Sequence, residues 1–233
     1  MELSNLSVGL NADCNASGSC TWSFGDVHVI ASVYGPKEAN MANELTHRAY
    51  IDVTVSPVSG FHTPYESEME LHITQLLERL IEVKNFPRNQ FNIRIQIVSG
   101  ISGHPATMAA CINAVSLSLM QTAIPLTASV VAVCSSEVDP KFRPVTISVD
   151  IANPSISEPT RTKRARSNGD GESTPAIFSV YSGRLNSPVF NENGSLSSQL
   201  LSMTNNLDPQ GLLCSRARDL FEVMAAQLTT NLS

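Results

Sequence analysis

The chain has 233 residues, of which 15% are charged, and a formal net charge of −6. This length suffices for one sizeable core, and the acidic balance argues against a freestanding nucleic-acid-binding protein that works by bulk electrostatics. Contact with RNA through one local face, or within a larger assembly, stays open. The five cysteines show no Cys-x-x-Cys spacing, and no run of about 18 apolar residues occurs. We therefore expect a reducing, intracellular compartment, no signal peptide and no membrane span.

Three strands are expected near the start of the chain, because apolar and polar residues alternate there with the period of two that suits a half-buried sheet. They cover residues 19–24, 27–34 and 51–56. Gly25-Asp26 predicts a hairpin turn between the first two strands, and Gly35-Pro36 is expected to end the second. Together they predict an antiparallel meander, which follows an irregular segment over residues 1–18.

Two helices are expected on either side of a fourth strand. Apolar residues recur at helical spacing over residues 65–84, and residues 91–98 alternate as a strand. Residues 106–121 are small or apolar on nearly every side, which predicts a helix buried on several faces. A glycine-punctuated loop over residues 99–105 leads into this helix, so its N-terminus is a place that can hold an anion on free backbone N–H groups.

The second half of the chain repeats this mixture of elements more loosely. Its expected elements are strands over residues 128–134, 145–151 and 176–181, a short helix over 195–203 and an amphipathic helix over 211–228. Residues 152–175 are rich in Pro, Ser, Gly and charge, which predicts an exposed, mobile insertion. Residues 1–233 are therefore expected to form a single α+β domain with mixed sheets packed with helices.

Several short motifs, taken in their order and spacing, resemble the ribonuclease PH family. They are Gly18-Ser19, Gly25-Asp26, Val33-Tyr34-Gly35-Pro36-Lys37-Glu38, Phe86-Pro87-Arg88, Ile112-Asn113-Ala114 and Ala123-Ile124-Pro125. The resemblance covers roughly residues 16–151, and the Arg-Pro-Asp-Gly-Arg segment usual in the family is lacking before them. It implies a ribonuclease PH-like fold, also described as ribosomal protein S5 domain 2-like.

The resemblance also implies where the chemistry of active members would lie. Those members degrade RNA from its 3′ end with inorganic phosphate as the nucleophile, which requires cations around phosphate and acidic groups for Mg²⁺ or a proton. Their arginine pair ahead of the first long helix falls on Pro64 and Tyr65, and Glu66, Glu68 and Glu70 follow. Carboxylates at this point would repel RNA phosphate.

The remaining family positions are equally depleted of charge. The Gly-Thr-Arg of the phosphate loop falls on Ala106-Thr107-Met108, which retains a hydroxyl and lacks the guanidinium that grips phosphate. The two catalytic aspartates align with Asp150 and Ile156, so one carboxylate remains. The resemblance thus implies a vestigial site with no catalytic residue, no cofactor and no metal.

Simpler roles stay open for these residues. Thr107 is either an anion ligand or a capping hydroxyl at the helix N-terminus, and Asp150 is either a metal ligand or a turn or cap residue. The three glutamates form either a metal-binding run or a first turn that the helix dipole favours. Asp26 and His28 share a strand face, which suits an acid–base pair or an ordinary hairpin.

Two further groups of residues carry functional hypotheses. The histidines have no zinc-type spacing with the cysteines, which argues against a metal site; they include His47, His62, His72 and His104. Lys163, Arg164 and Arg166 form a basic cluster that fits a nuclear-import or RNA-phosphate patch, or an ordinary solvated loop.

The function implied by the resemblance is that of a non-catalytic structural subunit in the RNA exosome ring, which supports rRNA processing and RNA degradation. The implied partners are other ribonuclease PH-like ring subunits, S1/KH cap subunits, a hydrolytic 3′–5′ exonuclease and single-stranded RNA in the ring channel, with no membrane. The implied location is the nucleus and nucleolus, and also the cytoplasm. The alternatives are an active phosphate-dependent 3′–5′ exoribonuclease and a freestanding RNA-binding module.

Overall fold

A computed structural model describes residues 6–134, 146–150, 177–181 and 212–232 of the chain. The insertion predicted over residues 152–175 and the helix predicted over 195–203 lie outside the described residues. So do Ile156 and the basic cluster of Lys163, Arg164 and Arg166.

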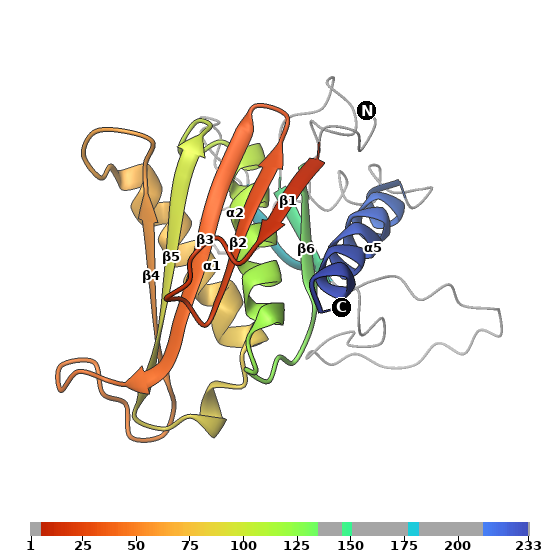
Figure 1. Cartoon of the computed structure of the whole chain (residues 1–233). Helices are drawn as coiled ribbons and strands as arrows, with labels where there is room; N and C mark the ends of the chain where they lie inside the picture. The colour runs from red at the N-terminus through yellow and green to blue at the C-terminus, as the bar shows by residue number, and fades with distance from the viewer. Residues whose placement is uncertain (1–5, 135–145, 151–176, 182–211, 233) are drawn as a thin grey trace, which may run out of the picture.

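The first half of the chain forms a five-stranded sheet. Its strands are β1 (Leu6–Leu10), β2 (Gly18–Phe24), β3 (Val27–Glu38), β4 (Tyr50–Ser56) and β5 (Asn89–Ser99). The strand order is β1-β2-β3-β5-β4, and β4 and β5 are the parallel pair. Figure 1 shows the whole width of this sheet, with β4 at its left edge and β1 at its right edge.

The meander predicted from the first three strands is wrong. Strand β3 pairs with β5 instead of β4, and β4 reaches its place beside β5 through a helical connection that makes the two strands parallel. Two other expectations fail locally. Residues 6–10 are not irregular but form β1, and β3 continues past Gly35-Pro36 to Glu38 through a register shift between Tyr34 and Lys37.

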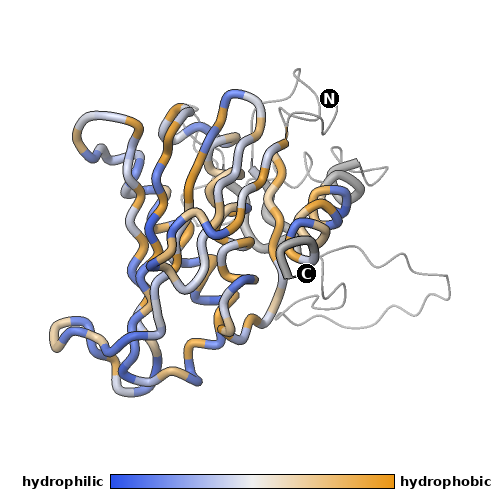
Figure 2. The backbone as a smooth tube through the Cα atoms, in the orientation of Figure 1, coloured by the Kyte–Doolittle hydropathy of each residue, from blue (hydrophilic) through white to orange (hydrophobic). Residues whose placement is uncertain are grey.

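Two helices cover one face of this sheet, as Figure 1 shows. Helix α1 (Pro64–Leu80) packs on β4, and helix α2 (Pro105–Gln121) packs on β2 and β3. A short 3₁₀ turn, η2 (Val83–Asn85), follows α1. The strand residues that face the helices are apolar and buried, and those on the opposite face are largely polar, which Figure 2 shows as alternating colours along the strands.

The second half supplies a three-stranded antiparallel sheet and a C-terminal helix. The sheet contains β6 (Val130–Cys134), β7 (Thr146–Asp150) and β8 (Ile177–Tyr181) in that order, and helix α5 (Leu212–Leu232) packs against β6 and β1. Helix α2 contacts both sheets, and every residue from Thr107 to Leu119 is buried. The predicted α+β fold class and the helix buried on several faces are both confirmed.

None of the helices in the described ranges combines the length and the apolar character that crossing a membrane requires.

Candidate functional site

The N-terminus of α2, where the resemblance places a phosphate loop, is capped by His104. The imidazole Nδ1 of His104 accepts a hydrogen bond from the backbone N–H of Ala106 at 3.2 Å. The capping role considered for Thr107 is therefore wrong. The Thr107 side chain is fully buried, and its hydroxyl oxygen has no hydrogen-bond partner within the described part of the chain.

Three backbone donors at this point, those of Gly103, His104 and Ala106, are already paired within the protein. The N–H of Gly103 donates to Met69 Sδ at 3.3 Å, and the N–H of His104 donates to the carbonyl of Ile101 at 3.1 Å. Pro105 has no N–H, and the Ala106 N–H is bound by His104. The sequence predicted free N–H groups here; the structure leaves few of them for an anion.

The cap also lacks positive charge at neutral pH. Burial lowers the pKa of His104, so the imidazole is largely neutral at pH 7. Met108, the residue aligned with the family's arginine, is 1% exposed and packs in the core. No cationic side chain therefore stands at the positions from His104 to Met108.

Helix α1 begins beside this loop with a capping box. The Glu66 carboxylate accepts hydrogen bonds from the Thr63 backbone N–H at 2.7 Å and from the Thr63 hydroxyl. Burial by itself raises the pKa of Glu66, but hydrogen bonds from Ser102 and Thr63 outweigh it, so the net pKa is lowered. Glu66 as a whole is 1% exposed, so its ionised carboxylate lies buried between the N-termini of α1 and α2.

The structure brings the two family positions together. Gly103 of the loop before α2 lies against Tyr65, since a Cβ built on Gly103 would lie 3.2 Å from Tyr65 Cδ1. Ser102 hydrogen-bonds Glu66 across the same contact. The place of the arginine pair and the place of the phosphate loop are therefore adjacent, and the charge built into their contact is negative. This arrangement suits helix capping better than phosphate binding.

Replacing Glu66 with alanine is expected to lower the free energy of unfolding by about 1 kcal/mol at pH 7, because the capping box is lost. The folded-state pKa of Glu66 is lowered, so its contribution is present above the unfolded-state pKa and is lost as the pH falls through the folded-state pKa. Urea denaturation at pH 7 and in acid measures both effects. Glu68→Ala, an exposed neighbour, is the control and should change stability by less than about 0.5 kcal/mol.

The three glutamates of α1 do not converge on one point. Glu66 caps the helix, Glu68 is exposed, and Glu70 accepts from the Val55 N–H at 2.8 Å and lies 3.0 Å from Nε2 of His62. Across the described ranges, no group of three or more His, Cys, Asp or Glu side chains is placed to hold a metal ion. The metal-binding interpretation of this run has no geometric support.

Asp150 lies far from Thr107. It is the last residue of β7 and pairs with Val130, whose carbonyl accepts a hydrogen bond from the Ser116 hydroxyl at 2.7 Å. Ser116 follows Thr107 along α2 by a rise of about 13 Å. The start of β7 is the end close to the helix N-terminus, because the Thr146 hydroxyl donates to the Pro105 carbonyl. The structure therefore does not bring Asp150 and Thr107 into one site.

The remaining candidates lie on the β2–β3 hairpin and around helix α1. Asp26 is an exposed residue in the turn between β2 and β3, where Phe24 pairs with Val27, so the predicted hairpin is confirmed. His28 follows on β3 and pairs with Ser23. Burial lowers the pKa of His72 although Glu68 opposes the shift, and His62 contacts the Glu70 carboxylate at 3.0 Å.

One polar cluster was missed by sequence reasoning. The Tyr34 hydroxyl donates to the Asp13 carboxylate, and the Arg94 guanidinium lies 5.8 Å from the centre of the Tyr34 ring. The hydrogen bond to Asp13 raises the pKa of Tyr34 and lowers that of Asp13. The alternation of residues along β3 and β5 places Tyr34 and Arg94 on the sheet face that the helices leave uncovered, but only the β3–β5 register makes them neighbours.

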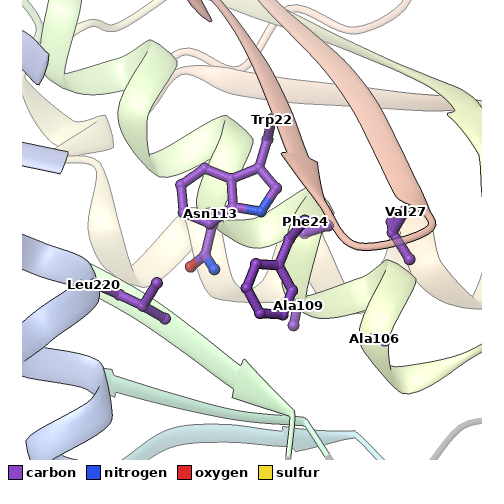
Figure 3. Close-up of a pocket in the computed structure, with 8 residues that line it drawn as sticks. Trp22, Phe24, Val27, Ala106, Ala109, Asn113 and Leu220 are labelled. Carbon is purple, nitrogen blue, oxygen red and sulfur yellow. The ribbon is translucent and has the colours of Figure 1, made fainter. Parts of the chain in front are cut away.

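A small cavity lies between helix α2, the β2–β3 hairpin and helix α5. Figure 3 shows Trp22, Phe24 and Asn113 around it, with Leu220 of α5 facing them. Its volume is about 10 Å³, which is room for roughly one water molecule. A nucleotide does not fit there.

The family comparison agrees with the fold. A model described as "3' exoribonuclease family, domain 1" matches residues 2–125. The chain is 31% identical over 134 residues to a putative exosome complex component RRP41 of Caenorhabditis briggsae, which covers 54% of this chain and 55% of the relative. It is 32% identical over 111 residues to the exosome complex component rrp46 of Schizosaccharomyces pombe, covering 48% of each. The chain spans about half the length of these curated relatives.

Solved structures share the architecture at low identity. Rice Rrp46 gives a TM-score of 0.65 at 19% identity, covering 96% of this chain and 94% of that chain. An archaeal exosome core gives 0.58 at 15% identity, covering 94% and 86%. These likenesses show the fold alone, whereas the family model spans more than half of the 233 residues. The chain therefore belongs to the 3′ exoribonuclease, or ribonuclease PH, family.

Proposed function

We propose that this chain is a non-catalytic structural subunit in the ring of an RNA exosome. In this role it helps to close a ring whose channel carries single-stranded RNA to a separate 3′–5′ exonuclease, in rRNA processing and RNA turnover. The curated relatives named as exosome components support the assembly. The proposed partners are other ribonuclease PH-like ring subunits, S1/KH cap subunits and the exonuclease, in the nucleus, nucleolus and cytoplasm.

The observation that carries the non-catalytic part of the proposal is the state of the α2 N-terminus. Phosphorolysis needs an inorganic phosphate held by cations and free N–H groups beside the RNA. Here the N–H groups of Gly103, His104 and Ala106 are paired, and Glu66 places a carboxylate next to them. A phosphate would have to displace these hydrogen bonds and overcome repulsion from the carboxylate.

A second candidate is an active phosphate-dependent exoribonuclease. It is favoured by the buried Thr107 hydroxyl, whose oxygen has no partner in the described residues, because an unpaired buried hydroxyl is costly unless something binds it. A relative from Arabidopsis thaliana, 29% identical over 133 residues, is named an exosome complex exonuclease RRP46 homolog.

The ring role is tested by native mass spectrometry of the tagged protein, purified gently from its own cells. We expect a particle many times heavier than the 25.1 kDa chain, with several partners of similar size and a separate large exonuclease. A monomer or a simple homodimer, with none of these partners, would contradict the proposal.

The non-catalytic role predicts that the purified chain releases no nucleoside diphosphates from single-stranded RNA, with or without added phosphate. Chromatography of the products measures this directly, and a phosphorolytic enzyme of the same family serves as the positive control. Phosphate-dependent release would contradict this role and establish the second candidate instead, and its loss in the Asp150→Asn variant would show that this chain, and not a contaminant, is responsible.

A further inference from the structure

At the outer edge of β4, the backbone N–H and C=O groups of Ile51 and Val53 have no hydrogen-bond partner among the residues that the structure describes. The N–H of Ala49, just before the strand, donates to the Val83 carbonyl at 2.9 Å, and the N–H of Val55 donates to Glu70 Oε1 at 2.8 Å. Both groups point away from β5. Because directions alternate along a strand, the N–H and C=O groups of Ile51 and Val53 point the same way. None of the described residues hydrogen-bonds to them.

A groove follows this stretch of β4, which forms the left margin of the sheet in Figure 1. Its volume is about 430 Å³. Its lining comes from β4 itself, from the segment before it and from Thr74 and Glu78 of α1. Ile51 and Val53, whose backbone groups are unpaired within the described residues, therefore line this groove.

Several of the usual protections of an edge strand are absent from β4. Natural proteins shield exposed edges with charged residues, above all lysine, with proline, bulges or very short strands, or with a covering helix or loop. Strand β4 has seven residues, no lysine and no proline, and its register with β5 is unbroken from Tyr50 to Ser56. The opposite edge strand, β1, has five residues. Within the described part of the chain, the paired N–H groups of Ala49 and Val55 bound the open stretch of β4, which leaves room for a short added strand.

The charged side chains that line the groove indicate which chemistry an added strand should have. Arg48 is paired with Glu78 at 3.2 Å, whereas Asp52 joins no ion pair among the residues that the structure describes. Glu70, at the end of the open stretch, accepts the Val55 N–H and lies 3.0 Å from Nε2 of His62, so it is already engaged. The unbalanced charge of the groove is therefore the carboxylate of Asp52, which is complementary to lysine or arginine on the incoming segment.

We propose that the β4 edge binds a short extended segment of a partner protein that carries lysine or arginine, and that this segment adds to the sheet as a sixth strand. It hydrogen-bonds to the backbone of Ile51 and Val53 and places a basic side chain beside Asp52. A second copy of this chain is a poorer occupant, because antiparallel self-pairing would bring two Asp52 carboxylates close together on chains of net charge −6.

The inference depends on strand geometry and not on the exosome role, so the two can fail separately. The test uses the full chain and two acetylated, amidated peptides, the basic TKVKVKT and the acidic TEVEVET. Residue-resolved amide hydrogen exchange by NMR is measured with each peptide. The basic peptide should slow exchange at Ile51 and Val53 at least about 10-fold at saturation, while Asp52 and Thr54, whose amides face β5, exchange slowly throughout.

A matched pair of variants tests the charge argument. Asp52→Asn should weaken binding of the basic peptide about 2- to 5-fold at low salt, and Thr54→Ala, on the same open face, should not change it. Unchanged exchange at Ile51 and Val53 with the basic peptide, or equal slowing by both peptides, would overturn the proposal. Slowing that depends on protein concentration without any peptide would assign the edge to a second copy, and would overturn it too.

Discussion

Replacing Gly18 with alanine is expected to lower the free energy of unfolding by about 2–3 kcal/mol. A Cβ at this position would lie 2.3 Å from the backbone carbonyl oxygen of Ser118 and 2.9 Å from Thr122 Cγ2. The obstacle is the backbone of a buried helix, which cannot move aside as a flexible side chain would. The next residue, Ser19, hydrogen-bonds Gln121 at 2.8 Å, so displacing β2 from α2 strains that bond as well.

Urea denaturation followed by circular dichroism measures this loss. Gly9→Ala is the matched control, because Gly9 also lies in a strand, and a Cβ there would meet Thr21 Cβ at an ordinary 3.7 Å. This control should leave stability unchanged or slightly raised, since alanine is less flexible than glycine in the unfolded chain. Equal losses in the two variants would show that close packing of β2 on α2 is not the cause.

Replacing Asn113 with leucine is expected to cost about 2–4 kcal/mol. The buried Asn113 side chain donates to the Ala132 carbonyl at 2.9 Å and accepts from the Ala132 N–H at 2.7 Å. It thereby pairs both outward backbone groups at the middle of β6, the edge strand of the second sheet. Leucine has a similar volume but leaves two buried backbone groups unpaired, each at a cost of about 1–3 kcal/mol.

The same denaturation experiment, with Ser118→Ala as the control, isolates this effect. Ser118 lies on the same helix and is buried, but its hydroxyl donates to carbonyls of Ala114 and Ala31. These carbonyls belong to a helix and a strand that pair them already, so losing the hydroxyl should cost less than about 1 kcal/mol. If Asn113→Leu is no more costly than Ser118→Ala, the polar contact between α2 and β6 is not a main source of stability.

Local patterns predicted most of the elements. The alternation over residues 91–98 corresponds to β5, and the apolar run over 106–121 corresponds to α2, within a few residues at each end. These patterns are reliable because a strand or helix of that length must bury one face or stripe, which requires apolar residues at a regular spacing along the chain. β1 was missed because it has only five residues, too few for a periodic signal.

The candidate site was predicted less completely. The resemblance indicated that the loops before α1 and α2 belong together, and they do meet, through Tyr65 and Gly103. It did not indicate that His104 would cap α2, or that Met69 and Glu66 of α1 would hydrogen-bond Gly103 and Ser102 of the loop before α2. Such contacts form between side chains and backbone groups that are distant in sequence, so no local spacing reports them.

The sequence by itself determined the family, the α+β class and the places of the main helices and strands. The tertiary structure decided which groups pair. Strand β4 lies parallel to β5 at an open edge, and Asp150 lies at the far end of β7 from Thr107. The N–H groups of Gly103, His104 and Ala106 at the start of α2 are occupied. The reason is physical. A residue's propensity and periodicity depend on its neighbours in the chain, whereas hydrogen-bond partners and strand order depend on how whole elements pack.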